Sequence, residues 1–151
     1  MGAEARLAEL GIVLPAAGTP VANFVMCKRA GDLLYVSGHG PRTAEGTITG
    51  KVGSTLTLEQ GREAARITTL NILASVRAEL GSLDRVVEVV KVLGMVNTAP
   101  GFNRTPEVIN GCSDLLIELF GEAGRHARSA VGMAELPFDI AVEIEMVLQV
   151  E

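Results

Sequence analysis

Apolar and polar residues alternate with a period of two through residues 140–150, near the C-terminus. This period predicts a β-strand, because neighbouring side chains of a strand point to opposite faces of the sheet. One face of the strand is entirely apolar, and we expect it to meet helices. The other face carries Glu143 and Glu145 between Ala141 and Val147. We expect this mixed face to be half-buried, against a cleft or another subunit.

A helical period replaces the strand period in residues 58–80, where apolar side chains recur on one helix face. Thr57 and Gln60 have the spacing of a capping box, in which each side chain binds a free backbone N–H group at the helix start. Gly81 suits the left-handed residue that ends a helix. These signals predict one long amphipathic helix.

A second helix is predicted from Thr105 to Gly121. Thr105 suits the N-cap, Pro106 suits the first helical position, and Gly121 ends the apolar stripe. The other predicted elements are a short helix at residues 1–10, strands at residues 24–29, 33–37 and 85–96, and a strand that begins at Arg128. Long amphipathic helices need a sheet to cover. We therefore predict an α+β two-layer sandwich, with one mixed β-sheet and two long helices packed on one face.

The length of 151 residues predicts a single domain, residues 1–151, with residues 1–20 as an N-terminal extension. No stretch has the ~20 uncharged residues of a membrane span, and the N-terminus lacks the apolar core of a signal peptide. We therefore expect a cytoplasmic protein with no membrane partner. In that compartment Cys27 and Cys112 are expected to be reduced thiols.

The formal net charge of −5 argues against a nucleic-acid partner, which would need a basic face. With one Tyr, four Phe and no Trp, the chain has no stacking platform for single strands. His39 and His126 lack metal-ligand spacing, and there is no phosphate-binding loop or nucleophile elbow. A lone histidine such as His126 is expected at the surface, whereas the glycines beside His39 indicate backbone placed close to another group.

Arg128, at the start of a predicted strand, carries the side chain best suited to recognise an anion. Its planar guanidinium matches a carboxylate with two parallel hydrogen bonds. The residues alone leave two interpretations of Arg128 open. It binds a ligand, or it pairs with Glu143 or Glu145 across neighbouring strands.

The string ARSAVGMAELPFDIAVEIEMV, residues 127–147, combines an Arg-Ser pair, a Leu-Pro turn and a final Val-Glu-Ile-Glu strand. LLYVSGHGP, residues 33–41, is a strand that ends in Ser-Gly, and residues 59–92 join a helix to a Val-rich strand. Together these segments resemble the YjgF/YER057c/UK114 family, also called RidA. The resemblance spans roughly residues 20–151. It is greatest to the branch described as chorismate-mutase-like endoribonucleases.

The resemblance implies a fold similar to that of chorismate mutase and a homotrimer with ligand clefts between subunits. Characterised members of the family hydrolyse reactive 2-imino and enamine acids to 2-oxo acids and ammonia. They need no metal ion and no cofactor for this reaction. The implied function of this chain is therefore deamination of a small carboxylate-bearing ligand.

The resemblance also assigns site residues by position. Arg128 corresponds to the arginine that binds the substrate carboxylate, and Glu143 corresponds to the glutamate that holds the hydrolytic water. These two residues are the predicted catalytic pair. The predicted substrate-binding residues are Phe24, Ser37, His39, Asn110 and Arg128.

Four positions depart from the family pattern. Phe24 stands where deaminases often have Tyr, so a phenolic hydroxyl is missing. His39 replaces a usual Gln, Ala130 a frequent Cys, and Gly132 a frequent Glu. These departures keep the carboxylate-binding arginine but bear on activity and on substrate size.

Two other functions remain open. The first is a non-catalytic trimer that senses or sequesters small carboxylates, which the departures at Phe24 and Gly132 favour. The second is the endoribonuclease activity ascribed to parts of the family, which the acidic charge and sparse aromatic residues disfavour. Similarity of fold to chorismate mutase does not carry that enzyme's activity.

Overall fold

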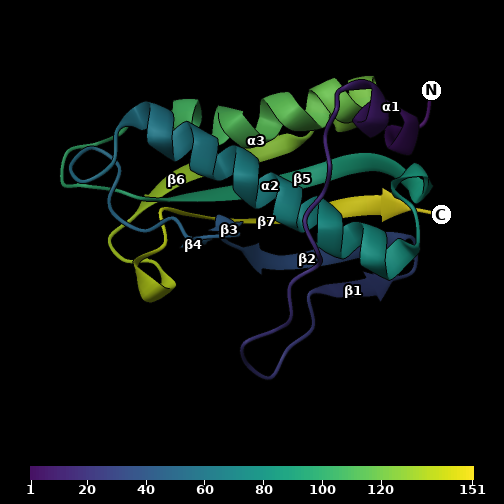
Figure 1. The fold of residues 1–151 in the computed structure, drawn as a ribbon, viewed down its shortest axis with the longest axis horizontal. Coiled ribbons are helices and arrows are strands. Elements are labelled where there is room, and N and C mark those ends of the chain that lie inside the picture. Colours follow the sequence, from purple (N-terminus) through teal and green to yellow (C-terminus); the bar gives the residue numbers. More distant parts are fainter.

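A computed structural model describes residues 1–151. The chain forms two layers, a β-sheet and a pair of long helices that covers one of its faces (Figure 1). The strands are β1 (Cys27–Ala30), β2 (Leu33–His39), β3 (Arg42–Thr43), β4 (Gly46–Thr47), β5 (Val86–Asn97), β6 (Ala127–Met133) and β7 (Val142–Val150). The helices are α1 (Ala3–Glu9), α2 (Leu58–Leu80) and α3 (Thr105–Phe120), with short 3-10 turns at Leu83–Arg85, Gly121–Gly124 and Pro137–Asp139. The predicted α+β sandwich is confirmed.

The main sheet has five strands in the order β1-β2-β7-β5-β6, and β3 and β4 form a separate small hairpin. Strands β5 and β6 run parallel, whereas all other neighbours in the main sheet are antiparallel. Parallel neighbours need a crossover connection, which α3 provides. The prediction of one mixed sheet is therefore confirmed.

Helix α2 has the bounds that its capping signals predict. The Oγ1 atom of Thr57 accepts the backbone N–H of Gln60 at 3.1 Å, and Oε1 of Gln60 accepts the backbone N–H of Thr57 at 2.9 Å. Gly81 follows the helix with φ of 84°, in the left-handed region that glycine adopts without a steric penalty.

Helix α3 begins one residue earlier than predicted. Arg104 occupies the N-cap, without a side-chain cap, and Thr105 is already helical. The Oγ1 hydroxyl of Thr105 donates instead to the backbone oxygen of Ala130 in β6, at 3.0 Å. The prediction of Thr105 as the N-cap is thus wrong, because a bond to the sheet takes the hydroxyl. The first strand is also shorter than predicted, since β1 starts at Cys27 and not at residue 24.

Strand β7 confirms the period of two. Its apolar side chains that lie under the helices are at most 2% exposed: Val142, Ile144, Met146, Leu148 and Val150. On the other face Glu143 is half-buried and Glu145 is exposed. No helix covers this second face (Figure 1). We call the two sides of the main sheet the covered face and the open face.

The N-terminal segment links the two layers. Helix α1 packs beside α3, and Nη2 of Arg77 in α2 lies 2.8 Å from Oε2 of Glu4. Residues 10–26 then run from α1 past α2 to β1, as the purple segment in Figure 1 shows. No helix in the chain combines the length and the apolar character that a membrane crossing requires.

Candidate functional site

The register of β6 sets the direction of the Arg128 side chain. Arg128 lies beside Val92 of β5, and Val92 lies beside Met146 of β7. Side chains that are paired in register point to the same face, and both Val92 and Met146 are buried under the helices. Arg128 therefore lies on the covered face, at the edge of the sheet beside α3.

Two side chains of α3 hold the half-buried guanidinium of Arg128. Its Nη1 atom donates to Oδ1 of Asn110 at 2.8 Å and to Oγ of Ser113 at 3.1 Å. Asn110 and Ser113 are three residues apart, so they share one face of the helix. Nη1 makes both of these bonds, and neither Nε nor Nη2 has an acceptor within the protein.

No carboxylate lies within 4.0 Å of the Arg128 guanidinium. The interpretation of Arg128 as an ion-pair partner of Glu143 or Glu145 is wrong, because those acids lie on the open face. The free edge of the guanidinium keeps the two-donor fork that a ligand carboxylate matches.

The hydrogen bonds of Arg128 continue to His126. Ser113 Oγ lies 2.9 Å from Nε2 of His126, and Nδ1 of His126 lies 2.7 Å from the backbone oxygen of Gly124. A carbonyl oxygen only accepts, so Nδ1 carries the proton and Nε2 accepts from the Ser113 hydroxyl. Burial lowers the pKa of His126, and the charge of Arg128 lowers it further, against the bond to Gly124. The prediction of His126 as a surface residue is wrong, since it is half-buried.

Glu143 lies on the open face, beside Met95 of β5, and is half-buried. Its carboxylate has no hydrogen-bond or ion-pair partner, and it packs against Gly38. A Cβ atom at Gly38 would collide with the Glu143 carboxylate. Burial raises the pKa of Glu143, and the neighbouring charge of Glu145 adds to the rise. An unpaired carboxylate with a raised pKa is suited to proton transfer near neutral pH.

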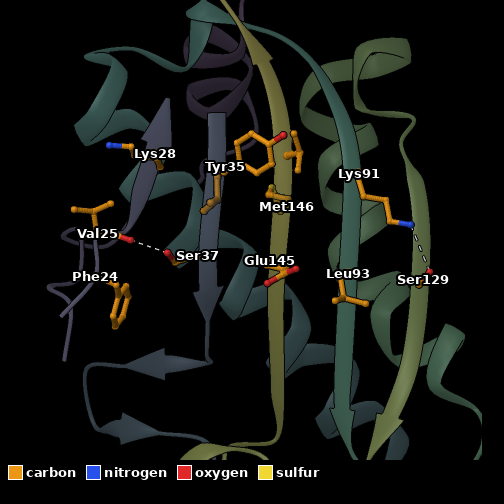
Figure 2. A pocket seen from close by; sticks show the side chains of 12 residues that line it. Phe24, Val25, Lys28, Tyr35, Ser37, Lys91, Leu93, Ser129, Glu145 and Met146 are labelled. Atoms are coloured by element: carbon orange, nitrogen blue, oxygen red, sulfur yellow. Dashed lines mark hydrogen bonds between the residues drawn. The ribbon is translucent and has the colours of Figure 1, made fainter. Parts of the chain in front are cut away.

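A hollow of about 630 Å³ lies on the open face, across β1, β2, β7, β5 and β6. Figure 2 shows Tyr35, Glu145 and Lys91 on neighbouring strands around it. The sequence-based prediction missed Tyr35, Lys28 and Lys91. Each of these residues follows or precedes a buried residue along its strand, and this alternation is the sequence signal that could have placed them on the open face.

Phe24 and Ser37 form one side of this hollow (Figure 2). The Ser37 hydroxyl donates to the backbone oxygen of Val25 at 2.6 Å, so it fixes the segment before β1. Phe24, in that segment, is 43% exposed and presents an aromatic ring without a polar atom. Ser37 therefore acts on the shape of the hollow through the backbone.

His39 lies on the opposite side of the sheet from Ser37, after an irregularity in the pairing of β2 with β7. Its Nδ1 atom lies 2.6 Å from the backbone oxygen of Ser37, and its Nε2 atom lies 2.8 Å from Oγ of Ser75 in α2. Burial lowers the pKa of His39 more than the bond to Ser37 raises it. Both nitrogens are thus occupied inside the protein.

Five of the six predicted site residues fall into two groups in one protomer, and the sixth, His39, is buried against α2. Arg128 and Asn110 lie together on the covered face, at the β6 edge. Phe24, Ser37 and Glu143 lie on or beside the open face. Strand β5 separates β6 from β7, so a single protomer does not bring Arg128 and Glu143 into one site.

The structure shows what lies beside Gly132, the position at which many family members have Glu. A Cβ atom at Gly132 would lie 2.9 Å from Oγ1 and 3.1 Å from Cγ2 of Thr98. The Thr98 side chain thus crowds the space that a longer residue would need. No group of three or more His, Cys, Asp or Glu side chains is arranged to hold a metal ion.

The structure is thus that of a small α+β protein with one bare sheet face, a guanidinium at the sheet edge that has no acidic partner, and an unpaired carboxylate on the bare face. A family profile described as "YjgF/chorismate mutase-like, putative endoribonuclease" matches residues 4–147. The chain belongs to this YjgF family.

Individual relatives are similar to this chain over nearly its whole length. Protein TCP17 of Trypanosoma cruzi is 46% identical over 147 residues, which cover 96% of this chain and 92% of that protein. The 2-iminobutanoate/2-iminopropanoate deaminase of Dermatophagoides farinae is 29% identical over 143 residues, covering 93% and 95%. The crystal structure of Atu1372, a protein of unknown function from Agrobacterium tumefaciens, has a TM-score of 0.91 and 43% identity. That match covers 99% of this chain and 92% of Atu1372.

Proposed function

We propose that this protein hydrolyses small 2-imino acids to 2-oxo acids and ammonia, in clefts between the subunits of a homotrimer. The observation that carries the proposal is the guanidinium of Arg128. Asn110 and Ser113 fix one of its nitrogens, and its other edge is free to bind a carboxylate. The similarity of the chain to a named deaminase, 29% identical over 143 residues, supports the same reaction.

The reaction needs a fixed imine and an activated water. Arg128 binds the carboxylate and fixes the C=N bond beside Glu143 of a second subunit. Glu143 takes a proton from water as the water oxygen bonds to the imine carbon, and the C=N bond becomes a C–N single bond. Glu143 passes this proton to the nitrogen, which gives a neutral carbinolamine. Glu143 then takes the proton of the carbinol hydroxyl and delivers it to the nitrogen as the C=O bond forms and the C–N bond breaks, so that ammonia and a 2-oxo acid are released. The raised pKa of Glu143 suits both transfers.

A second copy of the chain is required because Arg128 and Glu143 lie on opposite faces of one sheet. The open face supports such an assembly. Tyr35 is 49% exposed and Val131 is 39% exposed, and Leu93 and Val147 line the adjoining hollow. Exposed apolar residues gathered on one face mark an interaction surface.

A non-catalytic carboxylate-binding trimer is the second candidate. The apolar ring of Phe24 favours it, because that ring offers no hydroxyl to assist proton transfer at the edge of the hollow. Nucleic-acid cleavage has less support, since the net charge of −5 opposes binding of a polyanion.

The test is ammonia release from 2-iminopropanoate and 2-iminobutanoate generated in the assay by an amino-acid oxidase. Wild type is expected to accelerate release, and Arg128→Ala is expected to lower kcat/KM by roughly 100-fold or more. Arg125→Ala is the matched control, because Arg125 is three residues away and exposed, and its nearest acid is Glu122. It is expected to retain full activity.

Light scattering on the same samples is expected to give a trimer for all three proteins. Binding of 2-oxobutanoate without turnover would favour the non-catalytic trimer. Wild type that neither hydrolyses an imine nor binds a 2-oxo acid would exclude both candidates.

A further inference from the structure

A second hollow, of about 390 Å³, adjoins the candidate site behind Phe24. It lies between the N-terminal segment, the end of β2 and the turn before β7. Phe24 lines both this hollow and the larger one on the open face. Gly38, against which the Glu143 carboxylate packs, also lines it. The second hollow therefore begins beside the reacting groups of the proposed cleft and extends away from them.

Arg42 gives this hollow its only charge. The Arg42 side chain is exposed, and its Nη2 atom donates to the backbone oxygen of Ala16 at 2.7 Å. No carboxylate lies within 4.0 Å of its guanidinium, so Nε and Nη1 have no protein acceptor. His39, the other titratable group that lines the hollow, is buried and has its pKa lowered by burial and by Arg42. A hollow with one unpaired cation favours an anionic group.

Phe138 forms the outer wall of the hollow in a strained turn. Phe138 has φ of 56° and Asp139 has φ of 59°, and no other non-glycine residue has a positive φ. The turn is fixed by Nδ2 of Asn97, which donates to Oδ1 of Asp139 at 2.8 Å, and by the backbone N–H of Gly50, which donates to the Asp139 oxygen at 2.9 Å. The result is a ring that is 84% exposed. Strain of this kind persists where the surrounding structure holds it, and it is common at ligand-binding sites.

Asn71 of α2 lines the inner wall. Its Nδ2 atom donates to the backbone oxygens of Gly40 and Arg42, at 3.1 Å and 3.0 Å, and thereby fixes the backbone that carries Arg42. Its Oδ1 atom is the one buried side-chain polar atom in the chain that has no partner. Buried polar groups are almost always paired, and an unpaired acceptor of this kind is satisfied by a donor such as a water molecule, not by the anionic group itself.

We propose that this hollow receives the substrate side chain, and that Arg42 selects 2-imino and 2-oxo acids whose side chain ends in a second carboxylate. The proposal rests on the proposed function. The first carboxylate binds Arg128 of one subunit, while the reacting carbon lies beside Glu143 of the other. The methylene groups then pass Phe24 and Phe138, and the distal carboxylate binds the free edge of Arg42.

If Arg42 had a purely structural role, that role would be its hydrogen bond to Ala16, which anchors the N-terminal segment. The two roles differ in their effect on ligand choice. Loss of an anchor weakens binding of every ligand or of none, whereas loss of a distal cation weakens only ligands with a second carboxylate.

Titration calorimetry with two stable product-like probes tests the proposal. The probe 2-oxoglutarate carries a distal carboxylate, and the probe 2-oxobutanoate ends in a methyl group. Wild type is expected to bind 2-oxoglutarate about tenfold more tightly. Arg42→Gln is expected to abolish this preference and to leave the affinity for 2-oxobutanoate unchanged. Arg42→Lys, which keeps the charge but loses the planar fork, is expected to retain part of the preference.

Arg29→Gln is the matched control. Arg29 is also exposed and its guanidinium also donates to backbone oxygen, in this case to the oxygens of Gly31 and Glu151, but it lies away from the hollow. It is expected to keep the wild-type preference. Equal affinity of wild type for the two probes, or a preference that survives Arg42→Gln, would overturn the assignment of Arg42. If 2-oxobutanoate binds and 2-iminobutanoate is hydrolysed, that result leaves the proposed function standing; if neither occurs, both proposals fail.

Discussion

The two charged groups of the candidate site are held in opposite ways. Arg128 is fixed by hydrogen bonds from one of its nitrogens to Asn110 and Ser113. Ser113 is in turn hydrogen-bonded to His126. Glu143 has no polar partner, and its carboxylate packs against Gly38. The Arg128 cluster is therefore a polar network on the covered face, whereas Glu143 is a bare carboxylate on the open face.

In the proposed reaction, this difference would assign substrate binding to Arg128 and proton transfer to Glu143. A guanidinium that is held on one side and free on the other is prepared to bind an anion at little cost in side-chain entropy. A carboxylate that lacks donors keeps its proton to a higher pH and accepts one more readily. Changes in the Arg128 cluster should thus alter affinity, and changes around Glu143 should alter turnover.

The largest effect is expected from Glu143→Gln. The amide keeps the shape of the side chain but accepts no proton, so kcat with the substrate 2-iminobutanoate should fall by roughly 10²–10⁴-fold. The affinity for 2-oxobutanoate should change little, because Arg128 is untouched. Single-turnover kinetics and calorimetry measure the two quantities. An equal loss in affinity and in kcat would contradict the separation of roles.

The same variant tests the pKa of Glu143 through stability. The pKa of Glu143 is raised in the folded state, so the protein is most stable while Glu143 is protonated. The free energy of unfolding then decreases as the pH rises above 4.5, the ordinary pKa of the group. Glu143→Gln removes this loss. Its free energy of unfolding should therefore exceed that of wild type at pH 7, and the difference should vanish below pH 4.5, as measured by urea unfolding at both pH values.

The next effect is expected from Gly38→Ala. Gly38 does not have a positive φ, so alanine meets no backbone strain there, and its Cβ atom acts only by displacing the Glu143 carboxylate. We expect kcat to fall by about tenfold or more. A double variant with Glu143→Gln should be no slower than Glu143→Gln alone. Additive losses would mean that Gly38 acts on something other than Glu143.

The sequence predicted the covered face of the sheet better than the open face. Capping signals and helical spacing define α2, and the period of two separates the faces of β7, because local physics determines both. The positions of Arg128 and Glu143 relative to each other depend on the strand order β7-β5-β6, which no local pattern encodes. Ser113 was missed for the same reason, since its role depends on where α3 crosses β6.

A smaller effect is expected from Ser113→Ala. The variant removes one of the two acceptors of Nη1 and leaves Asn110 to hold Arg128 alone. A hydrogen bond to a charged group contributes about 1.5–3 kcal/mol, so KM for the imine substrate should rise about tenfold while kcat changes little. Steady-state kinetics separates the two constants. A loss confined to kcat would place Ser113 with the chemistry of Glu143 instead.

The smallest effect concerns His126, whose lowered pKa keeps its ring neutral at pH 7. Below that pKa the ring gains a proton on Nε2, and Ser113 loses its acceptor and faces two donors. The neutral ring therefore stabilises the Arg128 cluster above the ordinary pKa of 6.5, and this support is lost as pH falls through the lowered value. The affinity of wild type for 2-oxobutanoate should weaken a few-fold in that range, as followed by calorimetry.

His126→Gln keeps an acceptor for Ser113 but does not titrate between pH 7 and pH 5. Its Kd should stay flat where that of wild type rises, whereas its kcat should fall with acid as in wild type, because protonation of Glu143 controls that constant. The two pH dependences thus report on the two faces of the sheet separately. A Kd for His126→Gln that rises in parallel with wild type would show that acid acts on the carboxylate-binding side through a group other than His126.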